Sequence, residues 1–420
     1  MSDTTRPRIS GPALVQVLGD DLHGPGAAFR VLASAIAQSV DRGDLPGATL
    51  LPPERALATA LGMSRGTVVA AYEVLREDGV VLRRQGSGTW VRSATTNDGL
   101  VDTFEHDAAR RARRLTARVV EPPRDLIDLG LSVLDRPWGL DQIDMHVSVA
   151  ELTTAGGPHG YLPIGLSELR AAIAARFTDR GLATTIDQIA ITHGAQQSIA
   201  LAARLLVHPG DTVALESPTF PGAIDAFSRA GARFTTVAMD SCGAKVGDVE
   251  RVLREDTRLL YLVASCHSVT GSVMAEHRRR EIATLVDSSE SWLIEDETLA
   301  PLCFGGPPPP PMAVHGSSDR HVTVGSLAKQ VWAGLRVGWI RAEPTLISRL
   351  ARLRAATDLG GSIHSQVVAL RCLDGLDERT EALRAQVAER SAQLVRRITP
   401  ELPEWSVDIP EGGLSVWCRL

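Results

Sequence analysis

Lysine is almost absent from this chain, and one of its two lysines has neighbours that could support amine chemistry. The 44 basic residues include only Lys245 and Lys329, and the rest are arginines. Arginine stays protonated in proteins, whereas a lysine amine can lose its proton and form a Schiff base with an aldehyde. Lys329 follows Ser326 and precedes Arg336, so a hydroxyl and a guanidinium lie near the amine along the chain. Taken alone, Lys329 could equally be a surface lysine kept by chance.

Two features ahead of Lys329 suit the binding of a charged small molecule. Asp296 ends an apolar run where a strand is expected to stop; its alternatives are a helix cap and a metal ligand. Gly194 ends another strand-like run and introduces a helix that begins at Ala195 and Gln196. Backbone N–H groups at a helix N-terminus bind phosphate well. A glycine turn alone is weak evidence, and its position ahead of Lys329 strengthens it.

The elements that would position these residues alternate between strands and helices from about residue 126 onward. Apolar strand-like runs are separated by stretches rich in Ala, Arg and Leu, at 188–192, 212–216, 259–264, 292–295 and 321–324. This alternation predicts an α/β domain with a mainly parallel sheet flanked by helices. The run of five prolines at 307–311 must be a loop, because proline donates no backbone hydrogen bond.

Composition and charge set the remaining limits on function. No stretch approaches the ~20 apolar residues that cross a bilayer, and the first ten residues lack the apolar core of a signal peptide, so we expect a cytoplasmic protein. The five cysteines are scattered without a CxxC pair, which predicts neither disulfides nor a metal site. With a net charge of −6, any DNA binding must rest on a local group of arginines.

We predict three parts along the chain. Residues 12–92 contain short helices followed by a glycine-rich strand pair, and residues 93–125 are polar, with a basic run and a Pro-Pro pair typical of a linker. Residues 126–420 form the predicted α/β domain.

The N-terminal part has the pattern of two short helices joined by a glycine turn and followed by a β-hairpin. Ser64 is a suitable N-cap for the second helix, and Arg65 and Thr67 lie at its N-terminal end, the end that a recognition helix inserts into the DNA major groove. The hairpin has a basic, glycine-rich tip that can approach a phosphate backbone, with Arg83, Arg84 and Gly86. A protein–protein interaction module is the alternative for the same elements.

The order of these elements and residues resembles the winged helix-turn-helix of the GntR family. Leu-Pro-x-Glu-Arg, Ser-Arg-Gly-Thr-Val and Gly-Ser-Gly-Thr-x-Val all occur together. The resemblance implies that five residues contact DNA, namely Arg55, Ser64, Arg65, Thr67 and Gly86. Val69 stands where members of the family often have an arginine, so we expect Arg83 or Arg84 to compensate.

Segments between about residue 160 and the C-terminus resemble pyridoxal 5′-phosphate (PLP) enzymes of the aspartate aminotransferase fold. The resemblance makes Lys329 the Schiff-base lysine, which would carry PLP as an aldimine. It makes Asp296 the carboxylate that pairs with the protonated pyridine nitrogen and so keeps the ring an electron sink. Arg336 would bind the cofactor phosphate by charge-assisted hydrogen bonds, and Ser326 would donate to the same phosphate.

The same resemblance assigns the remaining contacts with the cofactor. The turn before Ala195 and Gln196 would bind the phosphate, and Phe220 would lie against the face of the ring, although a lone phenylalanine is more often a core residue. Tyr161 would reach the phosphate of the neighbouring subunit, which implies a homodimer. Ser268 and Leu299 depart from the family, which usually has asparagine and tyrosine there as donors to the phenolic oxygen of the cofactor.

The C-terminal segment 410–417 resembles the middle of the family's small domain. We therefore expect only a partial small domain here, without the arginine that holds a substrate carboxylate. A truncated form is the alternative. Together with the altered Ser268 and Leu299, this predicts a PLP-binding protein rather than an enzyme, with weak or partial transamination left open.

A GntR-like domain joined by a linker to an aminotransferase-like domain is the arrangement of the MocR family of PLP-dependent transcription regulators. We therefore predict a homodimeric regulator of the bacterial nucleoid that binds a double-stranded DNA operator. It would sense PLP itself or an amino compound, with no role for a membrane or a metal. Two alternatives stay open: an active PLP-dependent aminotransferase that carries a DNA-binding domain, and a regulator whose second domain is a PLP-free dimerisation scaffold.

Overall fold

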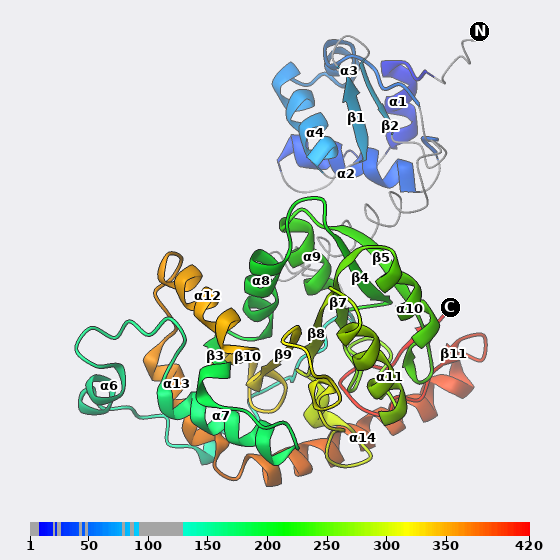
Figure 1. Cartoon of the computed structure of the whole chain (residues 1–420). Coiled ribbons are helices and arrows are strands. Elements are labelled where there is room, and N and C mark those ends of the chain that lie inside the picture. Colours follow the sequence, from blue (N-terminus) through cyan, green and yellow to red (C-terminus); the bar gives the residue numbers. More distant parts are fainter. Residues whose placement is uncertain are drawn as a thin grey trace. The chain divides into compact units, whose positions relative to one another are not determined.

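The computed structural model describes residues 8–19, 22, 27–41, 44–46, 49–77, 80–84, 88–91 and 129–420. The chain forms two compact units, Met1–Arg111 and Ala112–Leu420, which are described separately here (Figure 1). The predicted linker 93–125 and Gly86 lie outside the described residues, and Arg83 and Arg84 are described only in their backbone.

The N-terminal unit consists of helices followed by a two-stranded antiparallel hairpin, which confirms the predicted winged helix-turn-helix. Its elements are α1 (Gly11–Leu18), α2 (Ala28–Asp41), α3 (Glu54–Leu61), α4 (Arg65–Glu77), β1 (Val81–Arg84) and β2 (Gly88–Val91). The hairpin register runs from Val81 opposite Val91 to Arg84 opposite Gly88. Gly62 ends α3 with a φ of 64°, a left-handed conformation that glycine adopts without strain.

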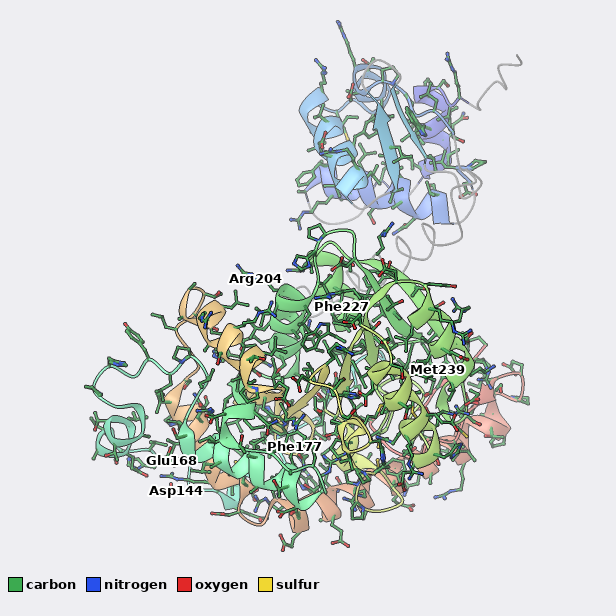
Figure 2. The ribbon with its side chains drawn as sticks, in the orientation of Figure 1. Asp144, Glu168, Phe177, Arg204, Phe227 and Met239 are labelled. Atoms are coloured by element: carbon green, nitrogen blue, oxygen red, sulfur yellow. The ribbon has the colours of Figure 1, made fainter. Side chains whose placement is uncertain are left out.

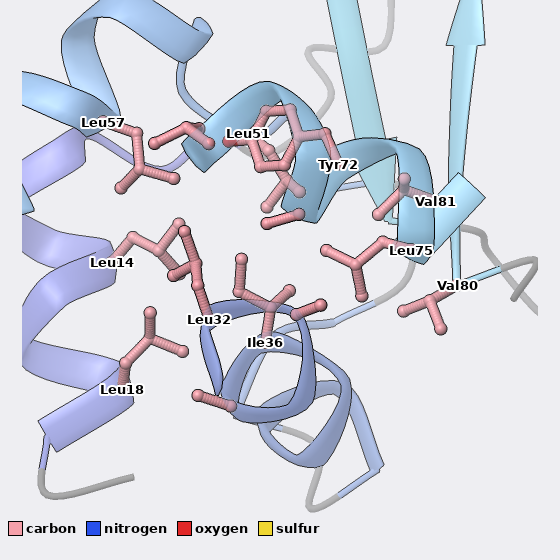
Figure 3. Packing of buried hydrophobic residues seen from close by; sticks show 14 of the residues in the cluster. Leu14, Leu18, Leu32, Ile36, Leu51, Leu57, Tyr72, Leu75, Val80 and Val81 are labelled. Atoms are coloured by element: carbon pink, nitrogen blue, oxygen red, sulfur yellow. The ribbon is translucent and has the colours of Figure 1, made fainter. Parts of the chain in front are cut away.

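One apolar cluster holds these elements together (Figure 3). Leu32 and Ile36 of α2 are fully buried, as their helical spacing predicts. Leu14 of α1, Leu57 of α3 and Tyr72 of α4 complete the centre of the cluster. The Tyr72 hydroxyl donates to the Pro52 carbonyl at 2.8 Å, so the one polar atom of this ring is satisfied inside the core.

The C-terminal unit is built on an eight-stranded sheet in the order β3-β10-β9-β8-β7-β4-β5-β6 (Figure 1). The four contacts from β9 through β8, β7 and β4 to β5 are parallel, whereas β10 is antiparallel to both β3 and β9 and β6 is antiparallel to β5. This confirms the mainly parallel sheet. The strands are β3 (Ile189–Thr192), β4 (Thr212–Ser217), β5 (Arg233–Asp240), β6 (Gly243–Ala244), β7 (Thr257–Leu262), β8 (Trp292–Asp296), β9 (His321–Ser326) and β10 (Gly338–Arg341).

Helices pack on this sheet because their apolar residues match the buried faces of the strands. One cluster joins α7 to β3, and another joins α10 and α11 to β7. The helices are α6 (Val149–Gly156), α7 (Ser167–Asp179), α8 (Ala195–Leu206), α9 (Pro221–Arg229), α10 (Val246–Arg254), α11 (Glu276–Asp287), α12 (Pro344–Ala355), α13 (Ile363–Leu373) and α14 (Leu376–Glu401). A short pair, β11 (Ser406–Val407) and β12 (Cys418–Arg419), follows α14. Among the described residues, no helix has the length and apolar character needed to cross a membrane.

Two arginines anchor the proline run, which is a loop as predicted. Arg180 donates to the Pro309 carbonyl at 2.9 Å and forms a two-armed ion pair with Glu297. Arg279 is fully buried and forms a 3.1 Å ion pair with Glu295. Successive side chains of an extended chain point to opposite faces of the sheet. Glu295 and Glu297 therefore point to the face opposite that of Asp296.

Candidate functional site

The candidate site lies where neighbouring strands of the large sheet end. Asp296 is the last residue of β8 and Ser326 is the last residue of β9. Strand β10 pairs with β9 and β3 so that Gly338 lies opposite both Ser326 and Thr192. Parallel strands of an α/β sheet bind ligands beyond their carboxyl ends, and the antiparallel β10 brings the end of β3 to the same place.

Arg336 and the start of α8 form an anion-binding arrangement. Gly194 precedes α8 with a φ of 93°, and a Cβ placed on Gly338 would lie only 2.7 Å from the Cα of Gly194. Glycine at both positions therefore permits this approach. Arg336 donates to the His193 carbonyl, and its Nη2 would be 3.4 Å from a Cβ at Gly194.

The chemistry of this arrangement follows from the helix end. Backbone N–H groups in the first turn of a helix, here at Ala195 and Gln196, have no acceptor within the helix. The positive end of the helix dipole adds to the guanidinium charge of Arg336. The structure thus brings Arg336, Ala195 and Gln196 together, and the three can hold a phosphate.

Lys329 lies in a short helical turn, Leu327–Lys329, between β9 and β10. Its side-chain ammonium donates to the carbonyl of Ser132. Burial lowers the pKa of the Lys329 amine, and the charge of Asp296 partly offsets this effect. A lowered pKa favours the neutral amine that attacks a carbonyl. The other lysine, Lys245, is exposed at the start of α10.

Asp296 is buried, and both of its carboxylate oxygens are fixed. Oδ2 accepts a 2.7 Å hydrogen bond from the Tyr261 hydroxyl, and Oδ1 accepts from the Thr298 N–H at 2.9 Å. The following helical turn has Leu299 at its N-cap, so Asp296 is not a helix cap. Among the described residues, no cluster of three His, Cys, Asp or Glu side chains could hold a metal ion.

Three buried residues beside Asp296 were not predicted from the sequence. Tyr261 lies inside the apolar run of β7, where a tyrosine does not stand out from its neighbours. Glu216 accepts from the Val263 N–H at 2.7 Å, and its Oε2 lies 3.6 Å from Nε2 of His267. Glu216 belongs to the segment that identified Phe220, and a glutamate inside an apolar run was the signal available for it.

Burial keeps Glu216 and His267 uncharged. It raises the pKa of Glu216 to about 8, with a further increase from Asp296 and an opposing effect of the Val263 N–H. Burial also lowers the pKa of His267 to about 4. At neutral pH, therefore, neither side chain adds a charge beside Asp296.

The two residues that depart from the family pattern provide little polarity. Leu299 packs in an apolar cluster with Cys266, Leu302 and Leu383, so it supplies no donor. Within the described part of the chain, the buried Ser268 hydroxyl has no hydrogen-bond partner. Ser268 is therefore the only one of the two with a group that could contact a ligand.

The other predicted cofactor contacts have different surroundings. Ser326 is buried, and its hydroxyl donates to the Val337 carbonyl at 3.0 Å and accepts from the Ala328 N–H. Its donation to a phosphate stays a prediction, because the hydroxyl proton is used within the chain.

Phe220 precedes α9 and lies beside Gln196, since both would crowd a Cβ placed on Gly222. Gln196 also donates to the Gly222 carbonyl at 2.8 Å, which ties the loop of Phe220 to the first turn of α8. Tyr161 is 57% exposed, with its ring 5.5 Å from that of His159. Its contact with a second subunit stays a prediction.

The predicted DNA-contact residues lie on α3 and at the start of α4. Arg55 and Arg65 are exposed. Ser64 caps α4, with its Oγ 3.1 Å from the Thr67 N–H and 2.8 Å from the Thr67 hydroxyl. Both arginines are therefore exposed on the two helices of the predicted DNA-binding motif.

Two family descriptions match this chain. Residues 124–420 match aminotransferase class I and II, and residues 30–91 match bacterial regulatory proteins of the gntR family.

Some known proteins resemble nearly the whole chain, and others resemble only its C-terminal unit. The chain is 28% identical to the uncharacterized HTH-type transcriptional regulator YdfD of Bacillus subtilis, over 93% of this chain and 84% of the relative. It is 27% identical to the probable rhizopine catabolism regulatory protein MocR of Rhizobium meliloti, over 93% of this chain and 81% of the relative. The crystal structure of Pyrococcus horikoshii kynurenine aminotransferase, a complex with PMP, aligns with a TM-score of 0.66 and 26% identity, over 73% of this chain and 79% of that chain.

Proposed function

Because the chain belongs to the aminotransferase class I and II family and carries an N-terminal DNA-binding domain of the GntR family, we propose that it is a transcription regulator that binds PLP covalently and senses it or an amino compound. The family and its solved relatives indicate PLP as the cofactor. The observation that carries the proposal is Lys329, which is half-buried in the turn after β9 and near enough to Asp296 for that charge to act on its amine, whereas Lys245 is exposed.

The residues of the site suit this cofactor. Arg336 and the first turn of α8 would hold the phosphate, and Asp296 would pair with the ring nitrogen. When bound, PLP supplies an aldehyde that reacts with primary amines and a ring that withdraws electrons. Lys329 provides the amine, and Ser268 provides an unpartnered hydroxyl.

We propose that the protein acts as a sensor rather than an enzyme. Leu299 lies in an apolar cluster, so one of the usual donors around the cofactor is missing. Binding needs the amine of Lys329 and the charges of Arg336 and Asp296, all of which are present, whereas efficient catalysis also needs accurate positioning and tuning. An active aminotransferase is the second candidate, and the likeness to kynurenine aminotransferase favours it. A PLP-free scaffold is the third.

A homodimer would provide two DNA-binding domains for an operator with two half-sites. Large apolar side chains exposed in the C-terminal unit support self-association, and they include Leu129, Leu131, Val133, Val149 and Tyr161. A ligand would change DNA affinity only to the extent that it binds the two arrangements of the dimer with different affinity. We place this regulator at the bacterial nucleoid, where its DNA operator would be.

Borohydride reduction followed by peptide mapping tests the covalent attachment. The purified full-length chain, incubated with PLP, should carry a reduced pyridoxyl group at Lys329. Lys329→Ala should lose the label, and Lys245→Ala, the matched control, should keep it. Label only at Lys245 would contradict the assignment to Lys329, and no label at all would favour a PLP-free scaffold.

A further inference from the structure

Tyr261 and Asp296 form a buried pair at the centre of the site. Tyr261 lies on β7 and Asp296 on the adjacent strand β8. The two residues are 0% and 4% exposed, respectively. The phenolic hydroxyl donates to Oδ2 of Asp296 at 2.7 Å. The ring of Tyr261 meets the ring of Phe227 edge-on, with centroids 5.9 Å apart; Phe227 lies on α9 and is labelled in Figure 2. The contact with Phe227 therefore sets the position of the Tyr261 ring, and the hydrogen bond to Asp296 sets the position of its hydroxyl.

The hydroxyl of Tyr261 remains a donor over the whole working pH range. Burial raises its pKa well above the usual value, and the charge of Asp296 raises it further. A hydrogen bond from such a donor stabilises the ionised form of the carboxylate. The Thr298 N–H donates to the other oxygen, so the plane of the Asp296 carboxylate is set from both ends.

Glu216 is the other carboxyl group that faces Tyr261. Its charge would act on the Tyr261 hydroxyl, but its pKa of about 8 keeps it protonated at neutral pH. It uses Oε2 to accept from the Val263 N–H, and His267 approaches the same oxygen. The hydroxyl of Tyr261 thus goes to Asp296 and not to Glu216.

We propose that Tyr261 is a positioning residue for the cofactor: its hydroxyl binds the Asp296 carboxylate and holds it in one orientation for pairing with the ring nitrogen of PLP. This inference rests on the proposed function. Because Tyr261 acts through Asp296, its removal should change the electronic state of the bound ring as well as the affinity for PLP.

Tyr261→Phe tests this inference, because it removes the hydroxyl and keeps the ring against Phe227. We expect the dissociation constant for PLP to rise about tenfold, which corresponds to the ~1.4 kcal/mol of one hydrogen bond to a charged group. We also expect the pH midpoint of the visible absorbance of bound PLP to move upward by about one unit. The reason is that a less protonated ring withdraws less charge from the nitrogen of Lys329.

Two variants separate positioning from packing. Phe227→Leu removes the ring contact and keeps the hydroxyl, so it should lower thermal stability without moving the absorbance midpoint. In an Asp296→Asn background, Tyr261→Phe should cause no further shift of the midpoint, because its effect passes through the carboxylate.

The outcomes are distinguishable. If Tyr261→Phe lowers stability but leaves the PLP affinity and the midpoint unchanged, Tyr261 is only a core residue and the inference is wrong. If the same midpoint shift persists in the Asp296→Asn background, the effect does not pass through Asp296. If the wild-type protein itself does not bind PLP covalently, the proposed function fails first.

Discussion

The ammonium group of Lys329 donates a hydrogen bond to the carbonyl of Ser132. A free ammonium has three N–H donors. Once the Lys329 nitrogen is bonded to the aldehyde carbon of PLP, it has at most one. Attachment of PLP would therefore take at least two of the three donors and turn the nitrogen toward the cofactor, so we expect the bond to Ser132 to be lost. In the sequence, Ser132 comes shortly after the predicted linker 93–125. Further along, Leu134 packs in the apolar cluster of Leu299, and the Trp138 N–H donates to the Val331 carbonyl at 2.8 Å.

This relationship predicts that covalent binding of PLP loosens residues 129–134. Hydrogen–deuterium exchange of peptides from this segment should become faster when PLP is added, whereas the amide of Trp138 should stay protected because its acceptor is a backbone carbonyl. Lys329→Ala should show the faster exchange from the start and should not respond to PLP. Equal exchange in the wild-type protein with and without PLP would show that the Ser132 contact does not restrain the segment.

Arg336→Ala should weaken PLP binding by about tenfold to a hundredfold, since hydrogen bonds from a charged donor contribute about 1.5–3 kcal/mol. Arg336 lies against the first turn of α8, so its loss removes a positive side-chain charge from this helix end. Arg352→Ala, an exposed arginine on α12, is the matched control and should bind as the wild type does. Equilibrium dialysis measures both. An affinity that does not change in Arg336→Ala would place the phosphate elsewhere.

Arg65→Ala and Arg55→Ala should each weaken operator binding by roughly 1–3 kcal/mol at fixed salt, if they contact bases or phosphates as we propose. Both side chains are exposed at the helices that frame the predicted DNA contact. Arg76→Ala is a control on the same helix as Arg65, because Arg76 is already paired with Glu73. A fluorescence titration with operator DNA gives the affinities, and PLP absorbance should stay constant in all three. If neither Arg55→Ala nor Arg65→Ala changes the affinity, the DNA contacts lie on other residues.

The raised pKa of Glu216 should make the free energy of unfolding fall as the pH rises, because the buried carboxyl then loses its proton. Its carboxyl titrates near 4.5 when unfolded and near 8 when folded, so the folded state binds more protons between these values. The penalty grows from about pH 4.5 and is complete above about pH 8. Glu216→Gln keeps an acceptor for the Val263 N–H without a charge, and it should gain on the order of 3 kcal/mol relative to the wild type between pH 5 and pH 8. Glu168→Gln, at an exposed residue of α7 labelled in Figure 2, should show no such trend. Thermal melts across this pH range check the difference, and parallel melting curves for the wild type and Glu216→Gln would refute it.

The sequence predicted the parts of the site that depend on short motifs. Lys329, Arg336 and the turn at Gly194 were identified because their types and spacing are unusual in the chain, and the structure brings them to one end of the sheet. The strand 338–341 was not among the expected runs, yet its antiparallel pairing is what places Arg336 beside α8. Helix α1 was likewise not predicted.

Tyr261 shows why the rest of the site was not predicted. Inside a buried strand a tyrosine and a phenylalanine give the same apolar pattern, and only the position of the neighbouring Asp296 shows where the hydroxyl donates. The hydroxyl of Ser326 is a second case. The sequence places it three residues before Lys329, but its use by the Val337 carbonyl depends on the return of the chain into β10. Pairings between distant residues of this kind are set by tertiary packing and not by local spacing.

Catalytic turnover by the purified protein should be very slow or absent. Leu299 stands where the resembling enzymes usually have a tyrosine, and here it is buried among apolar side chains that cannot replace the lost hydroxyl. Ser268 stands at the position of a usual asparagine, and its shorter side chain makes no hydrogen bond with any residue that the structure describes. Accurate positioning of the reacting groups contributes much of an enzyme's rate, whereas binding survives with the charged contacts alone.

Ser268→Asn restores the longer donor without filling the apolar cluster, so it should increase the rate at which bound PLP is converted by amino acids in a single turnover. Leu299→Phe is the size control, because it adds a ring without a hydroxyl and should give no gain. Steady-state assays with a panel of amino donors and 2-oxo acids provide the decisive measurement: a wild-type turnover of about 1 s⁻¹ or faster, the low end for ordinary enzymes, would identify the protein as an aminotransferase that carries a DNA-binding domain.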